Sequence, residues 1–340
     1  MVLQAIWFAL VGVLLAGYAV LDGFDLGVGI LYPFVTRSRR DRAILRASVG
    51  PVWDGNEVWL LAAAGALFAA FPPVYATVFS GFYLALAVVL LALILRAVSF
   101  EFHAHDEAWR GLWDVTLFAG SLLPALLFGV AAGNIVRGVP LGAGGEFAGA
   151  FFTLLNPYAL LCGVVGLVFF IQHGASWLAI KTHGDLRERV VAIRDTGQWA
   201  YTGLLGALAL TTLLALPQRF AAAGASPAGW LGIVLTWGGV AAAIFFASQE
   251  ADVMSLLGSS ASIIGLVALW AAGIFPYLVP GLGTAGGLSA FSSSSSQLTL
   301  GVMLAITLVG LPIVLAYTVV VYRVFSGKAL LDPEGSRKAL

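Results

Sequence analysis

Long runs of apolar residues alternate with short polar segments along most of the chain. A helix needs about 20 apolar residues to cross the hydrocarbon of a bilayer, and nine runs are long enough. Strands would alternate between apolar and polar positions, so continuous runs of this length predict helices. The predicted spans are residues 4–34, 50–71, 74–100, 112–136, 154–180, 195–216, 229–248, 258–279 and 298–325.

The composition supports this interpretation. The chain is 60% hydrophobic and 10% charged, with a mean hydropathy of +0.98, whereas a soluble domain carries roughly 25% charged residues. We therefore expect an all-α integral membrane protein, built as a single polytopic domain over residues 1–340. No basic segment precedes the first apolar run, which predicts a retained span and not a cleaved signal peptide.

The placement of lysine and arginine predicts the orientation, because these residues are enriched in cytoplasmic loops. With the N-terminus outside, only Arg137 and Arg219 lie on the outer side. The inner side then holds Arg37, Arg39, Arg40, Arg42, Arg46, Arg96, Arg110, Lys181, Arg187, Arg189, Arg194, Arg323, Lys328, Arg337 and Lys338. This asymmetry predicts an outer N-terminus and a cytoplasmic C-terminus. Basic and acidic residues are equal at 17 each, and no nucleic-acid partner is expected.

Acidic residues occur inside the first two predicted spans. Asp22 and Asp25 lie three positions apart in "VLDGFDLGVGIL", a spacing that puts both on nearly the same helix face. The glycines that follow leave room for close approach by another backbone. Asp54 and Glu57 have the same spacing in "GPVWDGNEVWL", and Arg96 ends the third span. Three consecutive helices are therefore predicted to bring four acids and one arginine to one depth near the inner surface.

Charges in a membrane are costly and commonly mark proton or ion routes, so the cluster is a candidate proton pathway from the cytoplasm. Asp25 and Asp54 are the leading residues, followed by Asp22 and Glu57. A structural alternative stays open. Asp54 and Glu57 can form a capping box at a helix start, and Asp22 and Asp25 can pair with Arg96 as structural ion pairs.

Ligands for a redox cofactor are scarce. His103 and His105 fall in an inner loop, His183 follows the fifth span, and His173 alone can lie within a helix. A bis-histidine haem site cannot be assembled from these residues, although His173 can be either a single axial ligand or a hydrogen-bonded core residue. Cys162 is expected to be a packing residue. The sequence contains no zinc, Walker or dinucleotide-binding motif.

A proton route without a redox centre suggests an accessory subunit of a redox complex. Two other classes remain open: a proton-coupled secondary transporter, because intramembrane acids also mark substrate sites, and a structural membrane scaffold. Trp59, one turn beyond Asp54, either belongs to the aromatic belt or lines a cavity or gas path.

Several segments resemble one known family. The segments "VLDGFDLGVGIL", "GPVWDGNEVWL", "ALFAAFPPVYATVFSGFYLAL", "LRAVSFEF", "GNIVRGVP", "LLNPYALLCG" and "SSQLTLGVM" occur in the order and spacing of subunit II of the cytochrome bd quinol oxidases, from about residue 5 to 325. The resemblance implies nine helices, arranged as two four-helix bundles plus a peripheral helix, in a bacterial cytoplasmic membrane.

The resemblance also implies partners and site roles. Subunit I of the family carries haems b and d and the quinol-oxidising loop, and the complex reduces oxygen to water with cytoplasmic protons. Some members add a small single-helix subunit or a structural quinone in subunit II, and all contact membrane lipids. Residues matching Asp25, Asp54 and Arg96 serve the proton route, a tryptophan matching Trp59 lies beside an oxygen channel, and the position of Glu57 varies.

Overall fold

The computed structural model describes residues 1–103, 106, 108–283 and 286–329. Within these ranges the chain forms twelve α-helices, one short 3₁₀ helix and one two-stranded sheet. The elements are α1 Val2–Val35, α2 Arg39–Val49, α3 Trp53–Ala70, α4 Pro72–Gly81, α5 Tyr83–Phe102, α6 Arg110–Arg137, η1 Phe151–Leu154, α7 Pro157–Lys181, α8 Gly184–Ala215, α9 Pro217–Gly224, α10 Pro227–Ser248, α11 Asp252–Ile274, β1 Tyr277–Pro280, β2 Gly287–Ser289 and α12 Gln297–Val324.

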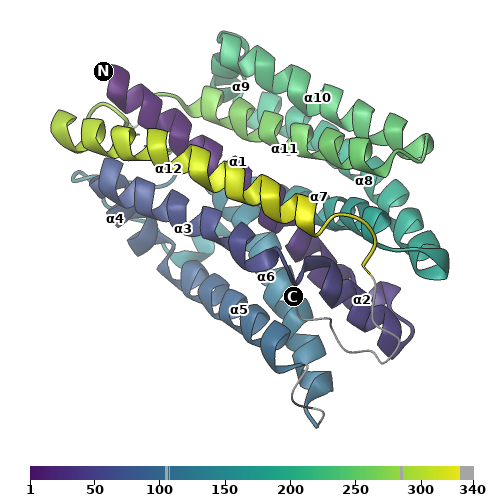
Figure 1. The fold of residues 1–340 in the computed structure, drawn as a ribbon. Coiled ribbons are helices and arrows are strands. Elements are labelled where there is room, and N and C mark those ends of the chain that lie inside the picture. Colours follow the sequence, from purple (N-terminus) through teal and green to yellow (C-terminus); the bar gives the residue numbers. More distant parts are fainter. Residues whose placement is uncertain (104–105, 107, 284–285, 330–340) are drawn as a thin grey trace.

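The helices form two groups joined by α1 and α7 (Figure 1). One group holds α1, α3, α5 and α6, and the other holds α7, α8, α10 and α11. Helix α12 runs along the outside of α1 and α3 (Figure 1). Among its residues only Leu300 is buried, so α12 is peripheral in this chain.

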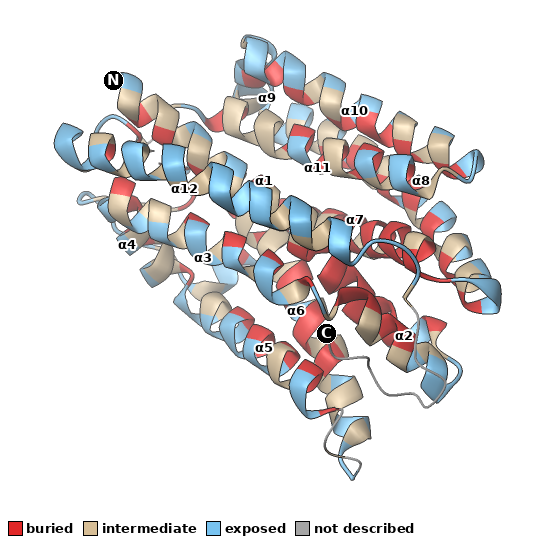
Figure 2. Ribbon diagram, viewed as in Figure 1, coloured by how far each residue is buried: buried red, intermediate tan, exposed pale blue. Residues whose placement is uncertain are grey.

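Helix α1 is central because it contacts α3, α6, α7 and α11. Its residues 22–32 are all buried, and Figure 2 shows buried positions concentrated around α1, α2 and α7. Gly27 makes the α1–α7 crossing close, since a Cβ there would lie 1.9 Å from the carbonyl oxygen of Phe170. The sequence predicted that another backbone approaches the glycines after Asp25, and the backbone of α7 does so at Gly27.

The number of helices that could cross a membrane is smaller than the nine spans predicted from the sequence. Seven described helices are long and apolar enough to cross a bilayer, and α8 with α9 makes an eighth if that pair, bent by 109°, counts as one span. Helix α3 occupies most of the predicted 50–71 segment but falls outside this set. Its 18 residues, about 27 Å in length, are just long enough, but the polar residues of its first turns lower its mean hydropathy.

Three predicted segments differ in detail. The segment 74–100 is divided at Phe82 into α4 and α5. The segment 258–279 ends as a helix at Ile274, because a residue preceding a proline, here Phe275 before Pro276, avoids helical dihedrals. Residues Tyr277–Pro280 then pair antiparallel with Gly287–Ser289. Helix α8 begins at Gly184, well before residue 195, where the predicted span starts.

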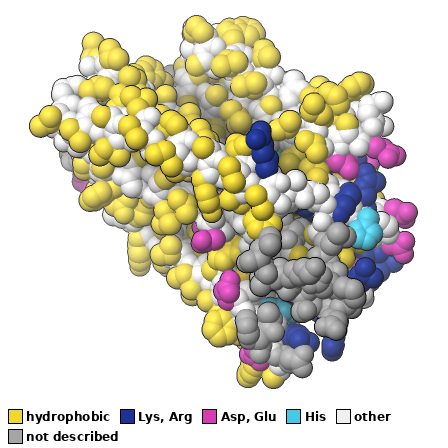
Figure 3. All heavy atoms as spheres, viewed as in Figure 1, with side chains coloured by type: hydrophobic (Ala, Val, Ile, Leu, Met, Phe, Trp, Pro, Cys, Tyr) yellow, Lys and Arg dark blue, Asp and Glu magenta, His cyan; other side chains and the backbone are white. Residues whose placement is uncertain are grey.

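An additional helix that the hydrophobic pattern did not predict follows α1. Helix α2 is amphipathic and starts at Ser38, whose side chain accepts a hydrogen bond from the backbone N–H of Asp41, an N-cap interaction. Figure 3 shows that charged side chains gather toward one end of the molecule, around α2 and the connection between α7 and α8, while most of the remaining visible surface is hydrophobic. Charge and apolar surface are therefore segregated along the helices.

Candidate functional site

Asp22 and Arg96 form an ion pair inside the first helix group. The two guanidinium nitrogens of Arg96 donate to the two carboxylate oxygens of Asp22, at 2.5 Å and 3.1 Å. Both side chains are fully buried. This bidentate geometry satisfies both charges, although the Nε of Arg96 has no partner. The predicted structural pairing therefore exists for Asp22, and it fixes Arg96 against α1.

Helix α3 supplies the second pair of acids. Glu57 lies with an oxygen 3.9 Å from Arg96 and keeps a side-chain exposure of 20%. Asp54, one turn earlier, is exposed. The helix begins at Trp53 with Val52 as its N-cap, and no side chain caps it, so the capping-box interpretation of Asp54 is wrong. Glu57 therefore lies near Arg96, whereas Asp54 lies exposed in the first turn of α3.

Asp25 has a different environment from Asp22. One of its carboxylate oxygens accepts a hydrogen bond from the amide nitrogen of Asn56 at 2.7 Å, whereas the other is buried without a partner. The Asn56 amide also donates to the carbonyl of Leu21 at 3.3 Å, and its oxygen accepts from the hydroxyl of Tyr322 at 2.9 Å. Asp25 is 1% exposed. A buried carboxylate with a free acceptor is a group that can take up a proton without breaking an ion pair.

Trp59 lies on α3 with its side chain buried against α1. A Cβ at Gly17 would come within 2.3 Å of the Trp59 ring, so the absence of a side chain at Gly17 makes room for the indole. Trp59 is 8% exposed. Its indole is thus packed between α1 and α3, and its role beside an oxygen path stays a prediction.

A second polar network lies at the end of the molecule near α2. Arg46 contacts the Tyr32 hydroxyl and lies 2.9 Å from His103, which is in turn 3.0 Å from Asp114. Arg42 donates to the same Asp114 carboxylate at 2.7 Å. Burial lowers the pKa of Arg46 from its usual value. His105, Arg337 and Lys338, which the sequence placed on this side, lie outside the described residues.

His173 is a hydrogen-bonded core residue. Its Nδ1 lies 2.6 Å from the Ser259 hydroxyl, and its Nε2 lies 3.0 Å from the carbonyl oxygen of Val20. With both ring nitrogens engaged, the side chain does not fit the role of a haem ligand. Across the described ranges, no group of three or more His, Cys, Asp or Glu residues is arranged to hold a metal ion.

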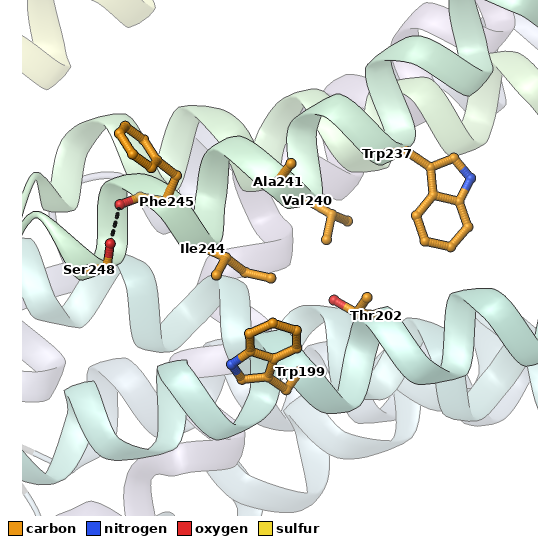
Figure 4. Close-up of a pocket in the computed structure, with 8 residues that line it drawn as sticks. All are labelled: Trp199, Thr202, Trp237, Val240, Ala241, Ile244, Phe245 and Ser248. Atoms are coloured by element: carbon orange, nitrogen blue, oxygen red, sulfur yellow. Dashed lines mark hydrogen bonds between the residues drawn. The ribbon is translucent and has the colours of Figure 1, made fainter.

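An apolar groove of about 520 Å³ lies on the other helix group, between α8 and α10 (Figure 4). Its two hydroxyl groups are engaged within their own helices, Thr202 with the carbonyl of Gln198 and Ser248 with that of Phe245. The groove is therefore better suited to binding a hydrocarbon chain than to catalysing a reaction. Its lining residues are Trp199, Thr202, Trp237, Val240, Ala241, Ile244, Phe245 and Ser248.

The sequence interpretation missed two members of the acid cluster. Asn56 lies between Asp54 and Glu57, and Tyr322 is separated from Asn56 by 266 positions. The polar amide inside a predicted span was a usable signal for Asn56. No sequence signal distinguishes Tyr322 from an ordinary interfacial tyrosine near a helix end.

These features define a helical membrane protein with buried carboxylates and an arginine near one end of its spans. The model of the family "Cytochrome bd terminal oxidase subunit II" matches residues 3–325. A Haemophilus influenzae protein named "Probable cytochrome oxidase subunit 2" is 38% identical, over 96% of this chain and 95% of its own length. The "Cytochrome bd-I ubiquinol oxidase subunit 2" of Escherichia coli is 37% identical, over 93% and 92%.

A solved structure has the same fold. One chain of the bd oxidase from Geobacillus thermodenitrificans aligns with a TM-score of 0.78 at 16% identity, covering 96% of this chain and 99% of that one. The chain belongs to the cytochrome bd terminal oxidase subunit II family. Of the three classes that the residue chemistry left open, family membership supports the subunit of a redox complex and not the secondary transporter or the structural scaffold.

Proposed function

We propose that this chain supplies a cytoplasmic proton route to a quinol-oxidising, oxygen-reducing complex. The chain is subunit II of a cytochrome bd-type oxidase, a class of quinol:oxygen oxidoreductase, and has no independent activity by itself. Its partner is subunit I, to which we assign haems b and d. The small single-helix subunit seen in some relatives is a further proposed partner.

The observation that carries the proposal is the contrast between the two buried acids of α1. Asp22 is neutralised by Arg96, whereas Asp25 keeps one buried oxygen without a partner. The exposed Asp54 and the half-buried Glu57 lie on the neighbouring α3. We propose that protons enter at Asp54, pass Glu57 and reach Asp25. The buried ion pair of Arg96 and Asp22 provides fixed charges beside this route.

The orientation follows from the same proposal. The end of the molecule that carries α2 and the α7–α8 connection is rich in arginine and lysine, and such ends lie in the cytoplasm of bacterial inner-membrane proteins. We place the N-terminus outside and the C-terminus inside. Asp54, at the start of α3, then faces the cytoplasmic side, from which the protons come.

Two finer assignments complete the proposal. We assign Trp59 to the wall of an oxygen path, supported by its burial between α1 and α3. The groove between α8 and α10 is apolar enough for part of the isoprenoid chain of a structural quinone, such as some members of the family carry. The whole chain is proposed to act as one polytopic membrane domain.

The test is turnover of the assembled oxidase carrying Asp25→Asn or Asp54→Asn. Oxygen consumption should slow in both variants while haem absorbance per complex stays at the wild-type value. Asp185→Asn is the matched control, because Asp185 is an exposed acid at the start of α8, outside the cluster. Normal turnover in both cluster variants would refute the proton route. Stoichiometric haem in the purified chain alone would overturn the assignment of haem to subunit I.

A further inference from the structure

Tyr322 is an unusual residue on a helix that otherwise makes few interior contacts. Within the described part of the chain, it is the one α12 side chain with a hydrogen bond to another helix. Two threonine hydroxyl groups of α12 bond within the helix, Thr307 to the carbonyl of Met303 and Thr318 to that of Val314. The peripheral helix therefore reaches the acid cluster through a single side chain.

The hydrogen bond from Tyr322 supports the orientation in which the nitrogen of the Asn56 amide faces Asp25. The tyrosine hydroxyl donates to the amide oxygen, while the amide nitrogen donates to the Asp25 carboxylate and to the carbonyl of Leu21. An amide nitrogen donates and therefore favours the ionised carboxylate, whereas an amide oxygen can bond only the protonated acid. The two ends of an amide have nearly the same shape, so shape alone does not choose between them. The carbonyl of Leu21 can only accept, which requires the amide nitrogen on this side. The Tyr322 hydroxyl favours the same orientation by donating to the amide oxygen.

The end of α12 is tied to α7, which holds Tyr322 in register. Lys181 donates to the carbonyl of Phe325 at 2.5 Å, Lys328 donates to that of Ala179 at 3.2 Å, and the backbone N–H of Ala329 donates to the carbonyl of Lys181 at 2.8 Å. Burial lowers the pKa of Lys328 from its usual value. Three hydrogen bonds thus fasten a helix end that has little apolar burial of its own.

Aromatic contacts complete the attachment. The Tyr322 ring lies edge-on to Trp177 and Phe24, with centroids 5.8 Å and 6.4 Å apart, and those two rings stack on each other at 4.3 Å. Phe24 is the residue directly before Asp25. The ring of Tyr322 can therefore stay in place when its hydroxyl is removed, which separates packing from hydrogen bonding in an experiment.

We propose that Tyr322 is a positioning residue of the proton route, acting through Asn56 to set the proton affinity of Asp25, with the α7-tethered end of α12 holding it in place. This inference rests on the proposed function, because it assigns a partner residue to the same site. It also gives the peripheral helix a role in proton transfer.

The decisive variant is Tyr322→Phe in the assembled oxidase, which keeps the ring and removes the hydroxyl. Turnover should fall about fivefold, the factor that one lost hydrogen bond of ordinary strength represents. The pH profile of turnover should shift by about 0.7 unit, with haem absorbance unchanged. Tyr317→Phe is the matched control, because Tyr317 is an exposed tyrosine of the same helix, and it should leave both rate and profile unchanged.

Two further variants separate the possible failures. Adding Tyr322→Phe to Asp25→Asn should cause no further loss of turnover, because the residue acts through Asp25. Lys181→Met should shift the pH profile in the same sense as Tyr322→Phe. A slow Asp25→Asn variant with a normal Tyr322→Phe variant overturns this inference alone. Normal turnover in both Asp25→Asn and Asp54→Asn overturns the proton route itself, and with it this inference. A loss of haem from Tyr322→Phe would indicate a structural role and would also overturn the inference.

Discussion

Removing Asp22 tests the buried ion pair most directly. The substitution Asp22→Ala leaves Arg96 fully buried without its bidentate partner. The closest remaining carboxylate oxygen belongs to Glu57, 3.9 Å away and partly exposed. That distance is too long for a strong hydrogen bond. The guanidinium would therefore keep its charge inside the helix group with only a weak compensating contact.

The expected loss is about 3–5 kcal/mol, which is typical when one partner of a buried ion pair is removed. Unfolding entropy is about 2.1 cal/mol/K per residue, or roughly 0.7 kcal/mol/K for a chain of this length. The loss therefore corresponds to a decrease in Tm of about 4–7 °C. The double variant Asp22→Leu/Arg96→Met removes both charges and should stay within about 1–2 °C of the wild type, because apolar replacement of a buried pair is often neutral.

The assay is a thermal melt of the detergent-solubilised oxidase, followed by intrinsic fluorescence. Arg42→Gln serves as the control, since Arg42 pairs with Asp114 at the surface with a side-chain exposure of 47%. Exposed pairs contribute about 0–1 kcal/mol, so its Tm should barely move. An unchanged Tm in Asp22→Ala, or a double variant as unstable as the single one, would refute the reasoning.

Two other predictions concern packing and the core histidine. Gly27→Ala should reduce the yield of assembled complex, because its Cβ would lie 1.9 Å from a carbonyl oxygen of α7, whereas Gly12→Ala should be neutral, with no atom within 4 Å. Equal yields by size-exclusion chromatography would contradict the close crossing. Ser259→Ala should destabilise by about 1–3 kcal/mol because it leaves a buried ring nitrogen of His173 without a partner. Ser260→Ala, whose hydroxyl bonds only within α11, should stay near the wild-type Tm, and equal melts for both serine variants would argue against the role of Ser259.

The origin of the acid cluster illustrates how local and distant interactions combine. A spacing of three residues places Asp22 and Asp25 on one helix face, yet one pairs with Arg96 and the other with Asn56. The difference arises because Arg96 reaches α1 from α5, whereas Asn56 reaches it from α3. A single helix can specify a shared face, but its neighbours determine the chemistry of each carboxylate.

The sequence by itself determined the helical character of the spans, since a long apolar run in lipid has to satisfy its backbone internally. It also placed acids and an arginine in the first three apolar spans, which correspond to α1, α3 and α4–α5, and it marked the close approach at Gly27. These properties depend on residues near one another in the chain. They could be predicted without knowing how the helices pack.

Only the tertiary structure decided which groups meet. It divided residues 74–100 into two helices, added the β1–β2 hairpin, left Asp54 exposed, and brought Tyr322 to Asn56 across 266 positions. The reason is that many rotations and registers of apolar helices bury similar hydrocarbon surface. Specific polar contacts and close approaches at glycines stabilise one of these arrangements over the others. These contacts join residues far apart in the sequence.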